Sequence, residues 1–262
     1  MSPAPRKRLA TVLAPLLLVG LLIGAWQIAS DTGALASLLG LEPFFVPSPA
    51  EIATSLWEDR SILAENAWVT LREVLAGFSV ALVLGVVLAA ILHLSPVLRR
   101  AVYPLVVASQ TIPIIVVAPI FVIWFGFGIG PKIAIIALIC FFPIVVNTLD
   151  GLAQAPADSS RLMRSLGAGR LRTFTTLEAP TALPYLFSGA KIAVAVAVIG
   201  AVFGEWAGAS SGLGYLMLLD APQVGQVPRL FASVFVLSAM AIALFAALAL
   251  AERRLVWWGS ER

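Results

Sequence analysis

The sequence predicts an all-α fold, a polytopic membrane bundle of six transmembrane helices. Two observations predict it: 60% of the 262 residues are hydrophobic and only 12% are charged, and the apolar residues gather in long stretches. Soluble proteins carry about 25% charged residues, so this chain has too few charges to cover a water-facing surface. Because lipid offers the backbone no hydrogen bonds, such stretches are expected to be helices.

Six stretches are long enough to cross a bilayer, whose hydrocarbon core requires about 20 apolar residues in a helix. They are residues 9–30, 74–94, 102–125, 133–149, 185–206 and 231–250. The first stretch is also compatible with a cleaved signal peptide, since Arg6, Lys7 and Arg8 precede it and Ala34-Leu35-Ala36 follow it. Its apolar run exceeds the roughly 7–15 residues of such peptides, which favours a retained span.

Basic residues indicate the orientation of the bundle. Most arginines and lysines fall in the N-terminal, C-terminal and alternate connecting segments; the exceptions are Arg60, Arg72, Lys132 and Arg229, with Lys191 inside the fifth stretch. Since cytoplasmic segments of membrane proteins are enriched in Lys and Arg, both termini are predicted to face the cytoplasm.

The longest polar segment, between the first two stretches, is expected outside. It contains Ser48-Pro49-Ala50-Glu51, a capping box with proline at the first helical position. This pattern predicts a short helix along the outer membrane interface. We therefore divide the chain into an N-terminal region with the first span (1–30), an external loop with an interfacial helix (31–73) and a core membrane domain (74–258) whose cytoplasmic loop covers 150–183.

Several kinds of chemistry are excluded by composition. The only lysines are Lys7, Lys132 and Lys191, and none precedes Ser or Thr, so the chain has no G-x-x-x-x-G-K-[ST] phosphate loop. One histidine, His93, and one cysteine, Cys140, cannot form a Cys/His zinc site. We expect His93 to be a packed or interfacial residue, no cofactor in this chain, and no nucleic-acid partner, because the charge surplus is small.

The loop between the fourth and fifth spans carries the densest basic cluster. Arg161, Arg164 and Ser165 lie three or four residues apart and share one helical face, beside an apolar stripe formed by Leu162 and Leu166. A short amphipathic helix of this kind fits a groove on a partner protein. A solvated basic loop and a site for anionic lipid are the alternatives.

This loop resembles the EAA loop of binding-protein-dependent ABC importer permeases, with the pattern E-A-A-x3-G-x9-I-x-L-P. The resemblance rests on Ser165-Leu166-Gly167, followed ten residues after the glycine by Leu177-Glu178-Ala179-Pro180. Arg161-Leu162-Met163 stands where E-A-A would be, and Ala179 replaces the leucine. The glycine-to-proline spacing is nevertheless that of the family.

Six further segments resemble blocks of the nitrate/sulfonate/taurine-type permeases, which include thiamine-precursor (hydroxymethylpyrimidine) permeases. They are FVPSPAEI (45–52), TLREVLAGF (70–78), QTIPIIVVAPIFVIWFGFGIGPKI (110–133), FFPIVVNTLDGL (141–152), LPYLFSGAKIA (183–193) and GEWAGASSGLGYL (204–216). The resemblance implies a type I ABC importer permease fold, in a multi-pass protein of the bacterial plasma (inner) membrane.

The same resemblance implies the partners. Two copies of the chain, as a homodimer, would form the route through the bilayer, and an external solute-binding protein would deliver the substrate. Two ATPase subunits, carrying the ATP and Mg²⁺, would bind the cytoplasmic loops. We expect coupling to the ATPase through Arg161, Leu162, Arg164, Ser165, Leu166, Gly167, Ala168, Arg170 and Pro180, with Gly167 allowing close backbone approach.

Polar residues inside spans are costly in lipid and are expected to face the route. On this ground the translocation pathway is predicted to include Gln110, Thr111, Pro113, Asn147, Glu205 and Trp206. Glu205 has two other interpretations, an interfacial cap and an ion pair with Arg72. Lys191 is expected to extend to cytoplasmic water.

The predicted substrate is a thiamine-precursor pyrimidine or a similar heterocycle. Aromatic and amide side chains in the spans suit a ring that stacks and hydrogen-bonds, and no Lys or Arg is predicted near mid-membrane to attract an anion. Import of nitrate, aliphatic sulfonate or taurine is the alternative within the family. A secondary transporter or channel is the alternative of another class.

Overall fold

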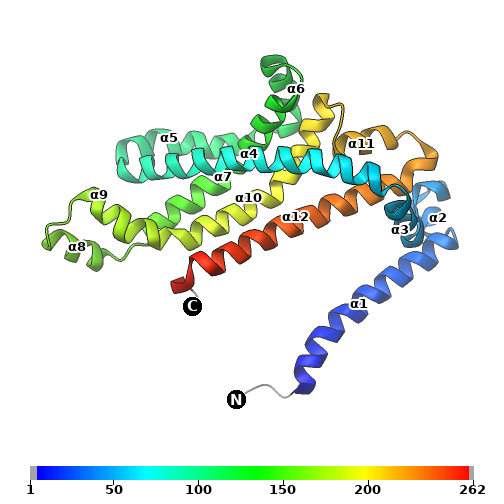
Figure 1. Ribbon diagram of the computed structural model, residues 1–262, viewed down its shortest axis with the longest axis horizontal. Coiled ribbons are helices and arrows are strands. Elements are labelled where there is room, and N and C mark those ends of the chain that lie inside the picture. Colours follow the sequence, from blue (N-terminus) through cyan, green and yellow to red (C-terminus); the bar gives the residue numbers. More distant parts are fainter. Residues whose placement is uncertain (1–4, 260–262) are drawn as a thin grey trace. The chain divides into compact units, whose positions relative to one another are not determined.

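The computed structural model describes the backbone of residues 5–259 and the side chains of residues 14, 15 and 17–258. This part of the chain contains helices and no strand, as the sequence predicts (Figure 1). The α-helices are α1 (Pro5–Asp31), α2 (Ala34–Leu39), α3 (Pro49–Glu58), α4 (Arg60–Leu94), α5 (Pro96–Ala108), α6 (Ile114–Phe125), α7 (Ile129–Ala153), α8 (Ala157–Ser165), α9 (Arg170–Thr173), α10 (Ala179–Gly208), α11 (Leu213–Asp220) and α12 (Val227–Leu255). Shorter turns are η1 (Pro43–Phe45), η2 (Ser109–Thr111), the π-helix η3 (Phe174–Glu178), η4 (Val224–Gln226) and η5 (Trp257–Gly259).

Four helical segments within the described residues are long and apolar enough to cross a membrane: Arg60–Leu94, Ile129–Ala153, Arg170–Gly208 and Val224–Leu255. They include the predicted second, fourth, fifth and sixth spans. The helix pair Pro96–Thr111 and Ile114–Phe125 makes five if it counts as one span. The backbone of α1 runs through the predicted first span, part of whose side chains lies outside the described residues.

The third predicted span, residues 102–125, is not one continuous helix but lies in two helices that meet at a sharp bend. The chain bends by 103° between η2 and α6. Pro113 lacks an N–H group, and its ring disfavours the helical conformation at Ile112, whose φ of −81° and ψ of 118° are extended. The proline therefore turns the chain in the middle of an apolar stretch.

The described helices form two compact units. The first contains the described residues up to 64 together with 216–235. Its α3 begins with the predicted capping box: Ser48 Oγ accepts from the Glu51 N–H at 3.3 Å, and Glu51 Oε2 accepts from the Ser48 N–H at 2.7 Å. In the same unit Arg229 donates two hydrogen bonds to the buried carboxylate of Asp220, at 2.9 and 2.5 Å.

The second unit contains residues 65–215 and the described residues from 236 on, and α7 is its central helix. It runs beside α10 (Figure 1), and small residues bring the backbones together. A Cβ atom at Gly189 of α10 would lie 2.6 Å from the Pro143 carbonyl oxygen of α7, and one at Gly85 of α4 would lie 2.7 Å from Ile144 Cγ2. Because lipid provides no hydrophobic force between helices, such close packing is what holds these three helices together.

Candidate functional site

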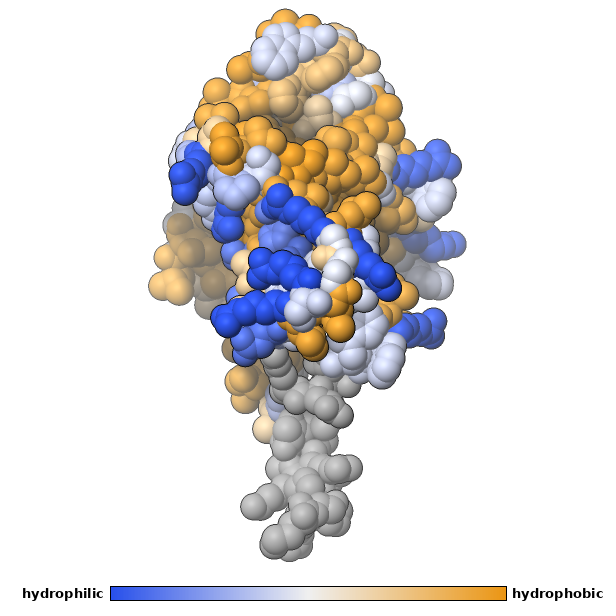
Figure 2. All heavy atoms as spheres, turned by 90° about the vertical axis from the view of Figure 1, so that its left-hand side faces the viewer, coloured by the Kyte–Doolittle hydropathy of each residue, from blue (hydrophilic) through white to orange (hydrophobic). Residues whose placement is uncertain are grey.

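The predicted coupling loop forms an arm, which we define as residues 157–178, comprising α8, α9 and the π-helix η3. None of the residues of α8 is buried. Leu162 and Leu166 are 60% and 75% exposed, although burial of such side chains is favourable by about 1.5–3 kcal/mol each. In Figure 2 hydrophilic side chains gather at this end of the second unit, with apolar atoms among them. An exposed apolar stripe flanked by arginines is typical of a protein-binding helix.

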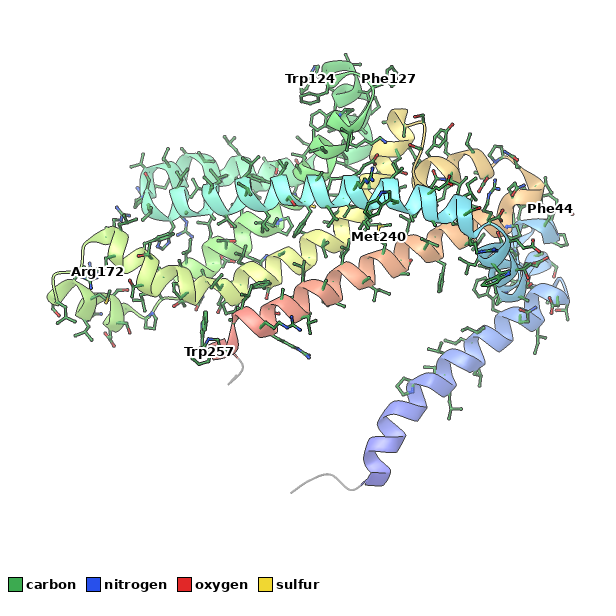
Figure 3. All side chains as sticks on the ribbon, viewed as in Figure 1. Phe44, Trp124, Phe127, Arg172, Met240 and Trp257 are labelled. Atoms are coloured by element: carbon green, nitrogen blue, oxygen red, sulfur yellow. The ribbon has the colours of Figure 1, made fainter. Side chains whose placement is uncertain are left out.

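The arginines of the arm have few partners of their own. Arg161 makes one exposed contact, 3.7 Å from Asp158, a kind of surface pair worth about 0–1 kcal/mol. Arg164 Nε donates to the Ser160 carbonyl at 3.3 Å. Arg170 and Arg172 have no carboxylate partner within the described residues, and Arg172 lies at the outer end of the arm (Figure 3). The arginine charges are therefore available to acidic groups of a partner.

Gly167 ends α8 through its backbone conformation. Its φ of +80° lies in the left-handed region, its N–H donates to the Arg164 carbonyl at 3.0 Å, and the N–H of Ala168 donates to the Met163 carbonyl at 2.9 Å. These two bonds define a Schellman motif. A Cβ at Gly167 would meet no atom of the chain within 4 Å, so within this chain the glycine serves the turn; its predicted close approach to the ATPase stays a prediction.

The base of the arm continues directly into α10. Pro180 lies there, whereas the other predicted coupling residues lie on α8, in the turn after it and at the start of α9. Glu178, the last residue of η3, pairs with His93 of α4, with Glu178 Oε2 and His93 Nε2 2.9 Å apart. The predicted packed or interfacial histidine therefore has a specific partner, which fixes the base of the arm to α4.

An open groove of about 1030 Å³ lies beside the base of the arm. Its lining combines aromatic, hydroxyl, amide and apolar groups without a charged side chain among the described residues: Gln154, Pro156, Thr176, Leu177, Pro180, Thr181, Pro184, Tyr185, Ser188 and Trp258. The groove can therefore stack and hydrogen-bond a ring, and it contributes no cation for an anionic solute.

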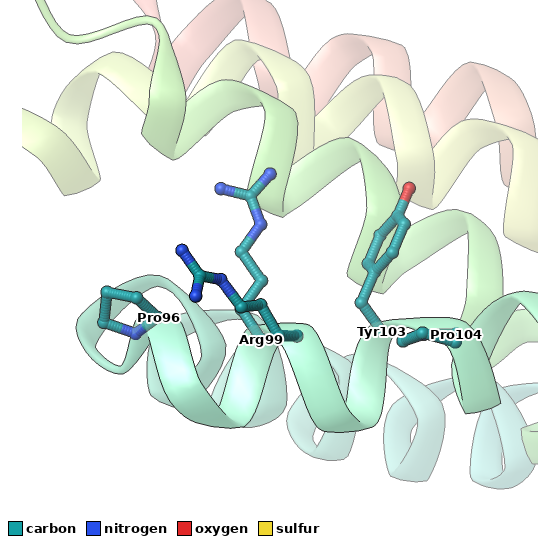
Figure 4. Close-up of a pocket in the computed structure, with 5 residues that line it drawn as sticks. Pro96, Arg99, Tyr103 and Pro104 are labelled. Atoms are coloured by element: carbon teal, nitrogen blue, oxygen red, sulfur yellow. The ribbon is translucent and has the colours of Figure 1, made fainter.

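A shallow pocket of about 430 Å³ lies on one face of α5 (Figure 4). Arg99, Arg100 and Tyr103 line it between two prolines. Neither arginine has a carboxylate partner in the part of the chain that the structure describes. The pocket contains none of the predicted site residues.

The predicted pathway residues lie at three places. Gln110, Thr111 and Pro113 are exposed at the break between α5 and α6, where Thr111 Oγ1 donates to the Ala108 carbonyl at 2.8 Å. Asn147 is half-buried in α7, and its Nδ2 donates to the Pro143 carbonyl at 2.8 Å. Glu205 and Trp206 lie near the C-terminal end of α10.

Glu205 is 1% exposed and its carboxylate is fully used by neighbouring donors. Its Oε1 accepts from the Thr70 hydroxyl at 2.6 Å, and its Oε2 accepts from the N–H groups of Gly214 and Tyr215 at 2.5 and 3.1 Å. The carboxylate thus caps the first turn of α11, where unpaired N–H groups and the helix dipole favour a negative charge.

Two further side chains of α4 hold the same loop. Thr70 Oγ1 accepts from the Leu213 N–H at 2.9 Å, and Asn66 Oδ1 accepts from the Gly212 N–H at 2.7 Å. We call these three side chains, Asn66, Thr70 and Glu205, the clamp, and residues 209–215 the clamped loop. Asn66 and Thr70 were not among the predicted site residues, because a single polar residue before an apolar stretch carries no distinctive pattern.

Neighbouring residues complete this end of α10. Trp206 Nε1 donates to the Gly214 carbonyl at 2.9 Å. The suggested ion pair between Glu205 and Arg72 is not formed, since the Arg72 guanidinium lies over the Trp68 ring at 4.6 Å from its centre. A Cβ at Gly212 would collide with the Glu205 carboxylate, and the φ of this glycine is +120°.

Lys132 and Glu73 form a buried ion pair beside the clamp. Lys132 Nζ donates to Glu73 Oε1 at 2.5 Å, and the two side chains are 8% and 4% exposed. Glu73 Oε2 is buried without a hydrogen-bond partner. From the sequence, Lys132 is expected in an external segment, and Glu73 is not among the predicted site residues. The sequence does show an acid and a base, each at the edge of an apolar stretch. Because charges inside a membrane protein are usually buried as pairs, the two residues could have been recognised as candidates for an ion pair.

Lys191 also has a partner. Its Nζ donates to Glu252 Oε2 of α12 at 2.8 Å, and both side chains are partly exposed. The pair joins α10 to α12, and the expected extension of Lys191 to cytoplasmic water stays a prediction.

Comparisons with known proteins show the family of this chain. Residues 81–257 match the family described as binding-protein-dependent transport system inner membrane component. The formylaminopyrimidine transport permease protein ThiX of Halalkalibacterium halodurans is 39% identical over 257 residues, covering 98% of this chain and 100% of the relative. The riboflavin transport system permease protein RibX of Chloroflexus aurantiacus is 35% identical, covering 91% of this chain and 87% of the relative.

A solved structure shares the fold. The crystal structure of an amino acid ABC transporter with histidines superposes with a TM-score of 0.61 at 14% identity, covering 77% of this chain and 98% of the other. The family match over most of the chain, the apolar helices and the two relatives matched over most of their length lead to one conclusion. The chain belongs to the family of inner membrane components of binding-protein-dependent transport systems, and it is a multi-pass permease subunit of an ABC transporter, a transport component rather than an enzyme.

Proposed function

We propose that this permease imports a thiamine-precursor pyrimidine or a similar heterocycle, using ATP hydrolysed by a partner. The observation that carries the ATP-driven part is α8, whose exposed Leu162 and Leu166 lie between arginines at the family's coupling position. Because the chain has no phosphate loop, ATP and Mg²⁺ bind the partner ATPase and this chain holds no cofactor. Two copies of the chain, two ATPase subunits and one external solute-binding protein make up the working importer.

The proposed orientation places both termini and the arm in the cytoplasm. The arm carries Arg161, Arg164, Arg170 and Arg172, and the C-terminal end of α12 carries further basic residues, as the positive-inside rule requires. We count α1 as the first span and the bent pair α5 and α6 as the third. Together with the four long apolar segments this gives six spans. The clamped loop then faces the outside, where the binding protein docks.

Two observations support a neutral heterocycle over an anion. Lys132 and Lys191 are the lysines of the described spans, and both are neutralised by carboxylates, Glu73 and Glu252. The large groove beside the arm has aromatic and hydrogen-bonding groups but no charged lining. A nitrate or sulfonate would find no unpaired lysine in these places, whereas a pyrimidine ring can stack and hydrogen-bond. ThiX, a relative along its whole length, is a formylaminopyrimidine permease.

Uptake into proteoliposomes tests this proposal. Vesicles containing the chain, its ATPase and its binding protein are expected to accumulate a labelled aminopyrimidine only with ATP. Unlabelled pyrimidine is expected to compete and taurine is not. Competition by taurine or sulfonate alone would favour the anion alternative, and uptake driven by an ion gradient without the ATPase would show a secondary transporter.

Replacing Gly167 by valine is expected to reduce ATP-driven uptake strongly while leaving the bundle folded. A β-branched residue is strained at a φ of +80° by roughly 1–2 kcal/mol, which frays the end of α8. Gly169→Val is the matched control, because the φ of Gly169 is −69° and a Cβ there also meets open space. Equal uptake by the two variants would contradict the role given to the Schellman turn.

A further inference from the structure

We propose that Thr70 is a positioning residue that makes the clamped loop and α10 one rigid body. A movement of the loop on docking of the binding protein is then transmitted through α10 to the arm. The identity of the two partners, the binding protein and the ATPase, rests on the proposed function. The local effect, that Thr70 holds residues 209–215 against α10, is independent of the proposed function.

Thr70 connects two elements through a single hydroxyl group. The side chain is 0% exposed; the hydroxyl lies 2.6 Å from Glu205 Oε1 and its oxygen accepts from the Leu213 N–H at 2.9 Å. The same oxygen lies 3.1 Å from the Asn66 carbonyl, a longer contact that competes for the one proton. The shorter contact is to a carboxylate, and hydrogen bonds to charged groups are the stronger ones.

The clamped loop does not cap itself. The four successive N–H groups of residues 212–215 donate to Asn66, Thr70 and, twice, Glu205. The first N–H groups of a helix are usually satisfied by a local N-cap residue. Here their acceptors come from α4 and α10, so the loop is tied to the bundle at every one of these positions.

The loop and the arm are attached to opposite ends of one helix. Glu205 lies near the C-terminal end of α10, which runs for 30 residues without a break and is thus about 45 Å long. At its N-terminal end α10 continues into the π-helix and the rest of the arm. Along its length α10 packs closely on α7 through Gly189 and Gly200. With the clamp in place, a movement of the loop is therefore passed to α10 and through it to the arm.

The test compares Thr70→Val with Thr70→Ser in the assembled importer. Valine keeps the shape but removes the hydroxyl, whereas serine keeps it. Thr70→Val is expected to keep unstimulated ATP hydrolysis at the wild-type level. The stimulation of hydrolysis by ligand-loaded binding protein is expected to fall about tenfold, the factor that corresponds to the loss of one hydrogen bond to a charged group. Thr70→Ser is expected to behave as wild type. Full stimulation in Thr70→Val would overturn the proposal.

A second readout needs no partner. It is hydrogen–deuterium exchange of the backbone N–H groups of residues 212–215, all of which donate to the clamp. Thr70→Val is expected to speed exchange of the Leu213 N–H about tenfold by removing its acceptor, and unchanged exchange would overturn the inference.

A second variant covers the case in which Thr70→Val fails to fold. Asn66→Ala removes the acceptor of the Gly212 N–H, and the same two measurements, amide exchange and stimulated hydrolysis, apply to it. If the wild-type assembly shows no stimulated hydrolysis, the proposed function fails, while amide exchange still decides the inference.

Discussion

Lys132→Met is expected to lower the free energy of unfolding by about 3–5 kcal/mol, because it leaves a buried charge without its partner. Glu73 is 3% exposed, and its Oε1 accepts a hydrogen bond from Lys132 Nζ. A denaturant or thermal unfolding curve of the purified protein in detergent measures the loss.

Two controls separate this effect from ordinary loss of packing. The double variant Glu73→Gln/Lys132→Met removes both charges and is expected to recover much of the stability. Lys191→Met breaks a pair of similar geometry, 2.8 Å, whose side chains are 21% and 24% exposed, and is expected to cost about 1 kcal/mol or less. An unfolding curve for Lys132→Met no lower than that for Lys191→Met would show that the pair does not stabilise the fold.

Replacing both Leu162 and Leu166 by aspartate is expected to abolish ATP-driven uptake and to weaken ATPase binding by more than tenfold. Each leucine contributes about 1.5–3 kcal/mol when buried in a groove, and an aspartate there adds an unpaired charge. Both side chains are exposed in the isolated chain, so its thermal stability is expected to stay unchanged. Copurification with the ATPase, uptake and an unfolding curve are the three measurements.

The matched control for this variant is Leu38→Asp/Leu39→Asp in α2 of the first unit. These leucines are 82% and 57% exposed, so the chemical change is the same on a surface that does not belong to the arm. The control is expected to bind the ATPase normally. If both double variants lost binding equally, the effect would come from added charge and not from the face of α8.

Features determined by neighbours in the sequence could be predicted. Ser48 and Glu51 are three residues apart and form the expected capping box. The stripe of Leu162 and Leu166 with its terminal Gly167 also follows from local spacing, and the structure has the helix and its turn there.

Features that depend on distant residues could not be predicted. Thr70 and Glu205 are 135 residues apart, and Glu73 and Lys132 are 59 apart. Hydropathy recognises each of them only as a polar residue at the edge of an apolar stretch; the packing of α4, α7 and α10 decides which ones meet. The break at Pro113 shows the opposite error, since apolarity alone predicts a straight span where proline bends the chain.

Crosslinking from α8 tests the central claim most directly. A photoreactive side chain is placed at position 166 and the protein is irradiated in cell membranes. We expect one dominant crosslinked product, which contains this chain and a nucleotide hydrolase with a phosphate loop. The same side chain at position 38 is expected to give no such product. The account would be contradicted if membranes take up substrate although no nucleotide hydrolase is crosslinked to position 166.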